Sequence, residues 1–324
     1  MTQVETLNGP IDVDQLGTVY MHEHIILVNR EIDANYPGRF DEEREVADAQ
    51  RKLRDLKAQG VDTVVVLTVF GLGRDVALVK RCAEGTGINV IVATGFYGFD
   101  ELPFFFKTRG PGTFHGGPEI LEEFFEQDLH VGIAHTGVKA GILKCVTDVK
   151  GITPDVERVL RAIARVHRRS GVPITTHTHA ATFRGRDQQA LFREEGVDLS
   201  RVVIGHCGDS TDIPYLIELM EAGSYIGMDR FGLDTFLEVP QRIDTVVELA
   251  RRGYAEQMVL SHDTTCWSMS FDPDVRAAKL PDWRYGFLME RGVPMMLERG
   301  VTEAQLRQMF VENPRAIFSR QGGY

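Results

Sequence analysis

The feature that most constrains the fold is a regular alternation of short apolar runs with helix signals. Eight runs are rich in Val, Ile and Leu, and each is followed by a helix or by a loop that leads into one. They cover residues 17–21, 63–68, 89–94, 140–145, 172–177, 202–206, 224–229 and 258–263. Nearly continuous apolar runs are typical of strands buried in a parallel sheet, and strands alternating with helices indicate βαβ units. Eight such units predict an α/β fold that closes into a single (β/α)8 TIM barrel.

The helices between these runs carry recognisable end signals. Thr153 is the expected N-cap of one helix, with Pro154 at its first position, and Gly60 stands where a helix-ending glycine belongs. We expect helices over residues 46–57, 75–83, 118–129, 154–166, 187–195, 213–222, 239–252 and, at the end of the chain, 302–318. Neither a linker nor a shift in composition interrupts the 324 residues, so residues 1–324 are expected to form one domain.

Composition excludes several partners. A formal net charge of -11 without a basic stripe argues against a nucleic-acid surface. The longest apolar run, residues 64–69, is too short to span a membrane, and residues 1–10 lack a secretory signal. Four scattered cysteines with no C-x-x-C spacing suit reduced thiols. We therefore expect a cytoplasmic protein without nucleic-acid or membrane partners.

Polar residues recur where the predicted strands end. His22 and His24 are two residues apart on one strand, so their side chains point to the same face. By itself this pair fits two surface histidines as well as a metal site. Other strand ends, however, carry polar residues that converge on the same rim, which is where TIM barrels build active sites. The converging set is His22, His24, Lys144, His177, His206 and Asp263.

These six residues favour a binuclear metal centre at the carboxyl ends of the strands. Four histidines and a carboxylate suit Zn, Fe, Co or Mn. Five such ligands exceed the need of one tetrahedral ion, so two ions that share a bridging hydroxide are expected. Lys144 would bridge them only if its neutral amine had captured carbon dioxide as a carbamate. A lysine within an apolar strand demands an explanation of this kind, because an uncompensated buried ammonium is costly.

The pattern resembles the phosphotriesterase family of the amidohydrolase superfamily over essentially the whole chain. The segments Gly205-His206 with Asp209, residues 227–232 and residues 261–263 are most similar to its phosphotriesterase-like lactonase branch. The resemblance implies that one metal is held by His22, His24 and Asp263, and the second by His177 and His206. N6-carboxylated Lys144 and a hydroxide would bridge the two divalent ions.

The resemblance also implies a function. It indicates hydrolysis of lactones, notably N-acyl-homoserine lactones (quorum quenching), with weak promiscuous action on organophosphate triesters, by a homodimer. Asp263 would take the hydroxide proton, Tyr97 would face the substrate carbonyl, and Arg230 and Asp209 would orient the proton relay. Arg230 stands where phosphotriesterases commonly have a histidine, which favours the lactonase. A structural ion pair at the barrel rim is the alternative role for Arg230 and Asp209.

Two aromatic segments are candidates for the substrate wall. After the eighth strand, Cys266, Trp267 and Phe271 would form an apolar channel for an acyl chain, or a plain lid over the core. The run over residues 102–106 is expected in a loop, either as cover for the barrel edge or as a dimer interface or substrate wall. His179 is interpreted as a supporting histidine and Cys207 as a small buried thiol.

Three rival functions remain from sequence alone. A dedicated organophosphate triesterase and an amidase would use the same machinery. A metal-bound barrel without turnover is the rival from outside the enzymes, and the intact six-residue set argues against it.

Overall fold

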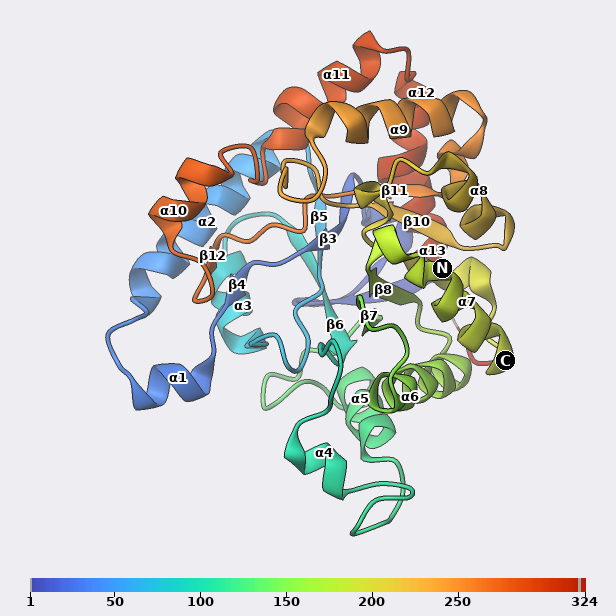
Figure 1. The fold of residues 1–324 in the computed structure, drawn as a ribbon. Helices are drawn as coiled ribbons and strands as arrows, with labels where there is room; N and C mark the ends of the chain where they lie inside the picture. Colours follow the sequence, from blue (N-terminus) through green and yellow to red (C-terminus); the bar gives the residue numbers. More distant parts are fainter. Residues whose placement is uncertain (1, 320–321) are drawn as a thin grey trace.

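The computed structural model describes residues 2–319 and 322–324 and contains an eight-stranded parallel barrel surrounded by helices (Figure 1). The strands follow one another around the barrel in chain order, and the hydrogen-bonded neighbours are parallel. They are β3 (Val19–Glu23), β5 (Thr63–Val66), β6 (Asn89–Gly95), β7 (Ile142–Thr147), β8 (Ile174–Thr178), β9 (Val202–Ile204), β10 (Tyr225–Met228) and β11 (Met258–Leu260). The predicted TIM barrel is confirmed.

The barrel closes between its first and last strands at their carboxyl ends. β3 and β11 stand at the two ends of the sheet order. Beyond β11, the N–H of Asp263 donates to the carbonyl of His22 at 3.0 Å, and the N–H of His24 donates to the carbonyl of Thr264 at 2.8 Å. These bonds draw the segment after β11 against the segment that carries His22 and His24.

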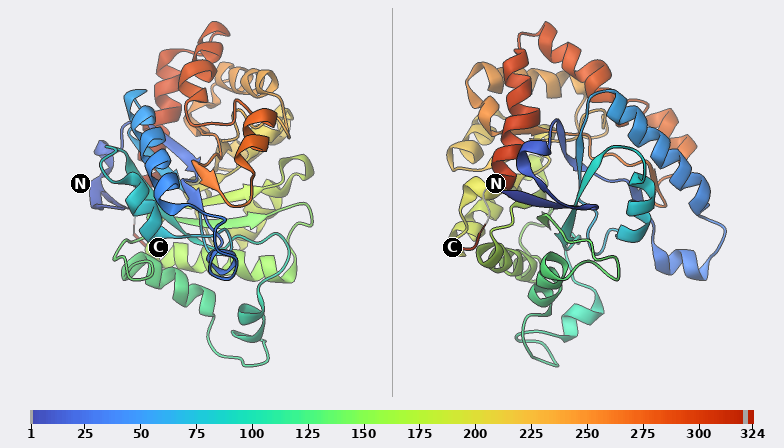
Figure 2. Two further views of the ribbon diagram at one scale, coloured as in Figure 1. Left: turned by 90° about the vertical axis from the view of Figure 1, so that its left-hand side faces the viewer. Right: turned by 180° about the vertical axis from the view of Figure 1, so that it is seen from behind.

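Helices cover the outside of the barrel (Figure 2). α6 illustrates how the sequence specifies them: Thr153 accepts the N–H of Val156, Pro154 opens the helix, and Gly171 ends it with a φ of 74°. The main helices are α2 (Glu42–Ala58), α3 (Val76–Ala83), α5 (Ile120–His130), α6 (Pro154–Ser170), α7 (Arg184–Glu194), α8 (Ile213–Glu221) and α9 (Val239–Arg251). The predicted helix at the end of the chain is present as α12 (Glu303–Arg307), a π-turn over residues 308–312 and α13 (Asn313–Ser319).

Alternation along the strands divides the core into two layers. In and just after β5, Val65 and Leu67 belong to the cluster inside the barrel, whereas Val64 and Val66 belong to the cluster beneath the helices. Successive side chains of a strand point to opposite faces, so one apolar run serves both layers. This explains why the predicted strands read as continuous apolar runs.

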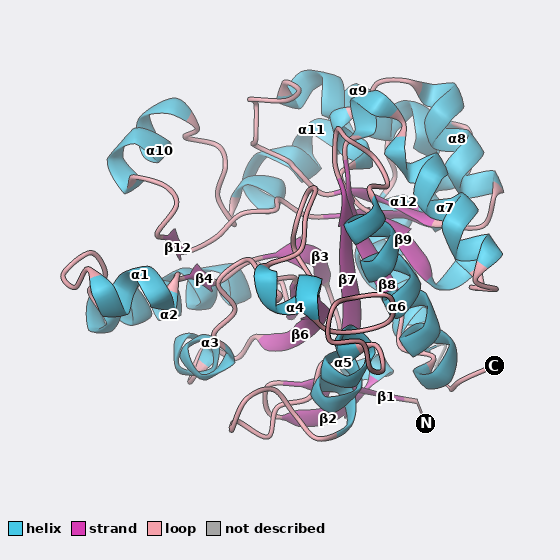
Figure 3. Ribbon diagram, turned by 60° about the horizontal axis from the view of Figure 1, so that its bottom comes forward, coloured by secondary structure: helices cyan, strands magenta, loops and turns pink. Residues whose placement is uncertain are grey.

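Several elements were not predicted. The chain begins with an antiparallel hairpin, β1 (Gln3–Thr6) and β2 (Gly9–Asp12), and the short strands β4 (Ile26–Leu27) and β12 (Trp267–Ser268) pair beside the barrel (Figure 3). Three short helices, α1 (Arg30–Asn35), α10 (Pro273–Lys279) and α11 (Val293–Glu298), were also not among the expected helices. Elements this short carry little periodic signal, which is why the sequence did not reveal them.

Three expectations about the strands and loops need correction. The aromatic run over residues 102–106 is not all loop, because Pro103 is followed by α4 (Phe104–Thr108), which projects from the barrel at the bottom of Figure 1. Lys144 is the third residue of β7 rather than its end. His206 and Asp263 lie beyond β9 and β11, because their φ angles of 59° and 54° turn the chain out of the sheet.

Within the described part of the chain, none of the helices is long and apolar enough to cross a lipid bilayer.

Candidate metal centre and active site

One cavity gathers all six predicted metal ligands. It has a volume of about 610 Å³ and lies at the carboxyl ends of the barrel strands. The residues come from five places around the barrel: His22 and His24 from β3 and its end, Lys144 from β7, His177 from β8, His206 from the turn after β9 and Asp263 from the turn after β11. Residues far apart in the sequence therefore meet at one site, as the strand-end pattern predicted.

A compact group of possible ligands is formed by His22, His24 and Asp263. Asp263 Oδ1 lies 3.1 Å from His24 Nε2 and 3.5 Å from His22 Nε2. His22 and His24 are buried and Asp263 is partly exposed, and their ligand atoms lie close enough together to hold one ion. This is the donor set that the family resemblance implies for one of the two metals.

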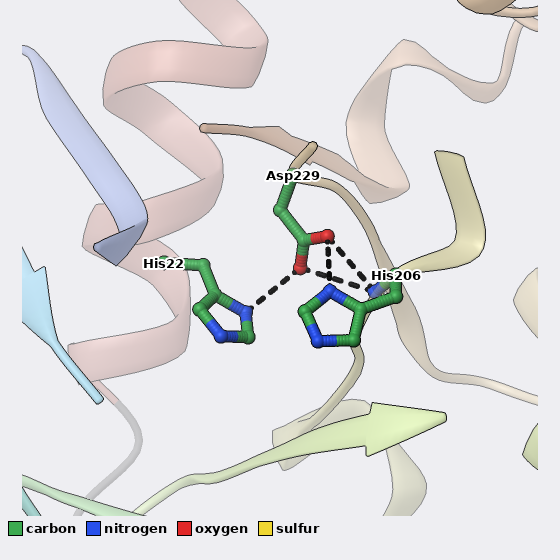
Figure 4. A group of neighbouring side chains, drawn as sticks. All are labelled: His22, His206 and Asp229. Atoms are coloured by element: carbon green, nitrogen blue, oxygen red, sulfur yellow. Dashed lines mark hydrogen bonds and ion pairs between the residues drawn. The ribbon is translucent and has the colours of Figure 1, made fainter. Parts of the chain in front are cut away.

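A second group, His22, His206 and Asp229, has a different role (Figure 4). Asp229 Oδ2 lies 2.9 Å from His22 Nδ1, while Oδ1 lies 2.9 Å from His206 Nδ1 and 2.9 Å from the backbone nitrogen of His206. The carboxylate is thus already surrounded by N–H donors and does not line the cavity. Asp229 holds the two imidazoles from behind, with each Nε2 directed away from it.

The other two histidines are held in the same manner. His24 Nδ1 lies 2.7 Å from Thr68 Oγ1, and His177 Nε2 lies 2.8 Å from Asp148 Oδ2. In metal sites, a ligating histidine typically donates its second ring N–H to an oxygen, which fixes the tautomer and the ring orientation. All four predicted histidine ligands show this arrangement, so the donor set fits a metal centre.

Burial keeps the imidazoles of His22, His177 and His206 neutral. It lowers the pKa of His177 to about 4 and lowers the pKa values of His22 and His206, with the Lys144 ammonium adding to the effect at His22 and the Arg230 guanidinium at His206. A neutral imidazole keeps a lone pair on one ring nitrogen, which is the form that binds a metal.

Lys144 is buried at the floor of the cavity. Its Nζ lies 3.1 Å from His22 Nε2 and donates to the carbonyl of Thr176 at 3.2 Å. Burial lowers the pKa of the Lys144 ammonium to about 8. An appreciable fraction of the side chain is therefore a neutral, nucleophilic amine near neutral pH.

A chain of ion pairs leads from Asp263 into the protein. Arg230 Nε donates to Asp263 Oδ2 at 2.9 Å, and Arg230 Nη1 donates to Asp209 Oδ2 at 2.7 Å. Arg242 Nη1 lies 2.7 Å from the other oxygen of Asp209. Desolvation would lower the pKa of buried Arg230, but its carboxylate neighbours outweigh this and raise the pKa. Arg230 therefore remains a cation that stabilises the ionised form of Asp263.

The cavity walls are largely apolar. They include Tyr97 and, around it, Leu27, Leu72, Phe99, Leu233, Phe236, Phe271, Leu280 and Trp283. Tyr97 packs edge-on against the ring of His177, with centroids 5.9 Å apart. Burial raises the pKa of the Tyr97 hydroxyl, so this group stays protonated and can donate a hydrogen bond.

Not every predicted wall residue reaches this cavity. Phe271 lines it, but Cys266 and Trp267 line a neighbouring cavity of about 710 Å³ between α2 and α10. The reason is that β12 pairs with β4, which holds Trp267 outside the mouth of the barrel. Of the aromatic run at residues 102–106, none lines the active-site cavity, and the run lies in the segment that projects from the barrel.

The structure also locates His179, interpreted above as a supporting histidine, and Cys207, interpreted as a small buried thiol. His179 lines the cavity, but its Nδ1 lies 2.9 Å from Thr182 Oγ1, and it belongs to neither group of possible ligands among the described residues. Cys207 is fully buried, and its thiol donates to the carbonyl of Ile204.

Sequence reasoning missed the residues that support the predicted ligands, directly or through Arg230 and Asp209: Thr68, Asp148, Asp229 and Arg242. Asp148 and Asp229 directly follow β7 and β10, so they carry the same strand-end signal as the ligands themselves. Gly227 makes room for Asp229, because a Cβ at this glycine would lie 2.3 Å from Asp229 Oδ2. A strand-end carboxylate two residues after a glycine is the signal that could have found it.

Comparison with known proteins agrees with this geometry. The Phosphotriesterase family matches residues 2–318. A "Phosphotriesterase homology protein" of Mycobacterium tuberculosis is 51% identical over 325 residues and covers 100% of both chains. The "Aryldialkylphosphatase" of Saccharolobus solfataricus is 35% identical over 312 residues, covering 95% of this chain and 97% of the relative. An "N-acetyltaurine hydrolase" of Bos taurus is 28% identical over 313 residues, covering 91% of this chain and 80% of the relative.

A solved structure shows the same fold. The "Structure of the phosphotriesterase from Mycobacterium tuberculosis" superimposes with a TM-score of 0.97 at 51% identity and covers 99% of this chain and 100% of the other. The members of this family are metal-dependent hydrolases with a binuclear divalent metal centre, and the His and Asp groups described above could bind such ions. The chain belongs to the phosphotriesterase family, and it is a metal-dependent hydrolase.

Proposed function

We propose that the protein is a lactonase that hydrolyses N-acyl-homoserine lactones and related lactones, with weaker action on phosphotriesters. The observation that carries this proposal is the cavity itself: apolar walls lead down to a buried cluster of metal-binding groups. A pocket of this kind accepts a substrate with an apolar tail and a compact, uncharged reacting group. An acyl-homoserine lactone combines these two parts.

The charges of the cavity support a neutral substrate. Among the described residues that line it, the permanent cation on the wall is Arg230, and this guanidinium is already paired with Asp263 and Asp209. The other basic side chain that lines the cavity is Lys144, which lies at the floor against His22. An anionic substrate such as N-acetyltaurine would need a cation for its sulfonate, because a buried charge without a partner is costly.

We propose the ligand sets that the family resemblance implies, and the grouping of His22, His24 and Asp263 supports the first of them. His22, His24 and Asp263 would hold one ion, and His177 and His206 the other, with Lys144 between the two groups. When bound, two divalent ions supply Lewis-acid polarisation of the scissile group and ionise water near neutral pH.

The protein residues then divide the remaining tasks. Asp263 Oδ1 faces His22 and His24, so Oδ2 is the atom that would accept the proton of the attacking water and pass it to the leaving alkoxide. Arg230 cannot relay that proton, because it stays protonated; it orients Asp263 through the bond to Oδ2. Tyr97 would donate a hydrogen bond to the substrate carbonyl as negative charge develops on its oxygen.

We propose that Lys144 is carboxylated. Its lowered pKa and its position beside His22 support this modification, since the neutral amine is the form that adds carbon dioxide. Carbon-13 NMR of the metal-loaded protein in labelled bicarbonate should show one carbamate signal that is lost in Lys144→Met. A spectrum without that signal would remove the carbamate from the proposal.

A panel of substrates tests the proposed function. We expect the highest kcat/KM for a long-chain acyl-homoserine lactone, a lower value for a neutral phosphotriester and the lowest for N-acetyltaurine. Fastest turnover of N-acetyltaurine would contradict the charge argument. Fastest turnover of the triester would support the second candidate, a dedicated organophosphate triesterase, which the 35% identity to an aryldialkylphosphatase favours.

We also propose that the protein is a homodimer in a reducing compartment, the cytoplasm. Exposed aromatic side chains gather on and after α4, where Phe104 is 81% exposed and Phe114 is 91% exposed. Exposed apolar groups of this size suit a protein interface. The four cysteines are free and buried. Light scattering should show that the wild-type protein is a dimer. The double variant Phe104→Ser/Phe114→Ser should shift toward monomer. A monomeric wild-type protein would refute the dimer.

A further inference from the structure

The buried carboxylate of Glu23 has no role in the chemistry described so far. Glu23 is the last residue of β3 and lies between His22 and His24 in the sequence, so its side chain points to the opposite face of the strand. Its side chain is fully buried and does not line the active-site cavity. Burying a carboxylate is costly unless it is well hydrogen-bonded, which directs attention to its partners.

Those partners all come from the segment that carries Asp263. Glu23 Oε1 accepts from Ser261 Oγ at 2.8 Å, from the His262 backbone at 2.9 Å and from His262 Nδ1 at 2.8 Å. Glu23 Oε2 accepts from the backbone of Thr264 at 3.0 Å. One carboxylate thus receives four hydrogen bonds from three residues on either side of Asp263: Ser261 and His262 before it and Thr264 after it.

The two backbone bonds bracket Asp263. The N–H before it and the N–H after it point to different oxygens of the same carboxylate, while the N–H of Asp263 itself donates to the carbonyl of His22. Asp263 has a φ of 54°, which side-chain-bearing residues rarely adopt and which surrounding contacts must maintain. The two backbone hydrogen bonds to Glu23 supply such contacts on both sides of Asp263.

Backbone hydrogen bonds from Leu288 and His22 hold the two side chains that donate to Glu23, namely His262 and Ser261. The backbone of Leu288 donates to His262 Nε2 at 3.1 Å, so His262 carries its proton on Nδ1 and donates it to Glu23. Ser261 Oγ accepts from the backbone of His22 at 3.0 Å and donates to Glu23. The network joins β3 to the segment after β11 where the barrel closes.

We propose that Glu23 is a positioning residue for the metal centre. It holds Asp263 in its left-handed conformation and thereby aims the Asp263 carboxylate at His22 and His24. This inference rests on the proposed assignment of those three residues as metal ligands.

Glu23→Gln tests the proposal. The glutamine amide would place its NH2 group against the backbone N–H of either His262 or Thr264, so at least one of these two hydrogen bonds is lost. Supporting groups behind metal ligands typically change affinity by roughly 10- to 100-fold. We expect the affinity for Co²⁺, measured by chelator competition, to fall within this range, and the visible spectrum of bound Co²⁺ to change because Asp263 is displaced.

A second variant and a matched control separate positioning from loss of stability. Ser261→Ala removes one of the four bonds to Glu23, together with the acceptor of the His22 backbone N–H, and should weaken Co²⁺ binding in the same direction but by less. Asn313→Ala is the control, because Asn313 is buried and donates to the carbonyls of Ala255 and Met258 at the opposite end of β11. It should lower the unfolding temperature of the metal-free protein but leave the Co²⁺ affinity and spectrum unchanged.

The outcomes are distinct. Wild-type Co²⁺ affinity and spectrum in both Glu23→Gln and Ser261→Ala would overturn the proposal, as would equal losses in Asn313→Ala. If Glu23→Gln does not fold, Ser261→Ala against the control decides. If the wild-type protein binds no Co²⁺, the ligand assignment itself is wrong; if it binds normally and the variants do too, only the role of Glu23 is wrong.

Discussion

Replacing Asp229 by asparagine perturbs the metal centre without touching a proposed ligand. In the native site, the Asp229 carboxylate accepts N–H groups from His22 and His206 on its two oxygens. An asparagine keeps the shape but presents an NH2 group to one of these donors. The affected imidazole must then turn or change tautomer, which removes its lone pair from the metal side.

The size of the effect follows from the bonds lost. A hydrogen bond to a charged group contributes about 1.5–3 kcal/mol, and 1.4 kcal/mol corresponds to a tenfold change in an equilibrium constant. We therefore expect Asp229→Asn to weaken metal binding roughly 10- to 100-fold, in line with other groups that support metal ligands. Gly227→Ala should act in the same direction, since its Cβ would push against Asp229 Oδ2.

The assay is competition for Zn²⁺ or Co²⁺ with a chelator of known affinity, combined with the metal content of the purified protein. Asp128→Asn is a suitable control, because Asp128 is a buried carboxylate that binds Arg74 and Thr94 away from the site. Unchanged metal affinity in Asp229→Asn, or an equal loss in Asp128→Asn, would refute the role of Asp229.

Three further outcomes are expected. Tyr97→Phe should lower kcat/KM for a lactone by about 100-fold or more, because loss of one hydrogen-bond donor to the developing oxyanion costs roughly 3 kcal/mol. The metal content should stay at the wild-type value. An unchanged kcat/KM would exclude Tyr97 from the reaction. Burial lowers the pKa of His167 below its usual value of 6.5, so the unfolded state binds more protons and stability should decline as pH falls below about 6.5. In His167→Gln, the slope of unfolding free energy against pH should flatten over this range, and an unaltered slope would show that other groups cause it. Chelation should abolish hydrolysis and lower the unfolding temperature, and added Zn²⁺ or Co²⁺ should restore both; activity that survives complete metal removal would contradict a metal-dependent reaction.

Much of the fold was predictable because its signals are long and repeated. The apolar runs of the barrel strands and the capped helices between them identify βαβ units, and the strand-end histidines then identify the site. Short elements such as β4 and β12 have no such periodicity. Their pairing decides that Trp267 lies outside the cavity, so this residue was misplaced from sequence alone.

The supporting residues were harder to predict for a physical reason. A proposed ligand such as His177 can be recognised by its residue type, whereas Asp148 acts only through the ring nitrogen that it holds. Likewise, Glu23 gains its role from a backbone that returns to it from the far end of the chain. Contacts of this kind depend on how the barrel closes, which the pattern of one strand does not contain.

The most direct test of the proposed function is the ratio of kcat/KM for a long-chain acyl-homoserine lactone to that for a phosphotriester, on one preparation with two bound ions per chain. If the cavity serves lactones, the ratio should exceed one by orders of magnitude in the wild type and fall in Tyr97→Phe. A ratio below one would show that the protein is a triesterase that uses the same metal centre.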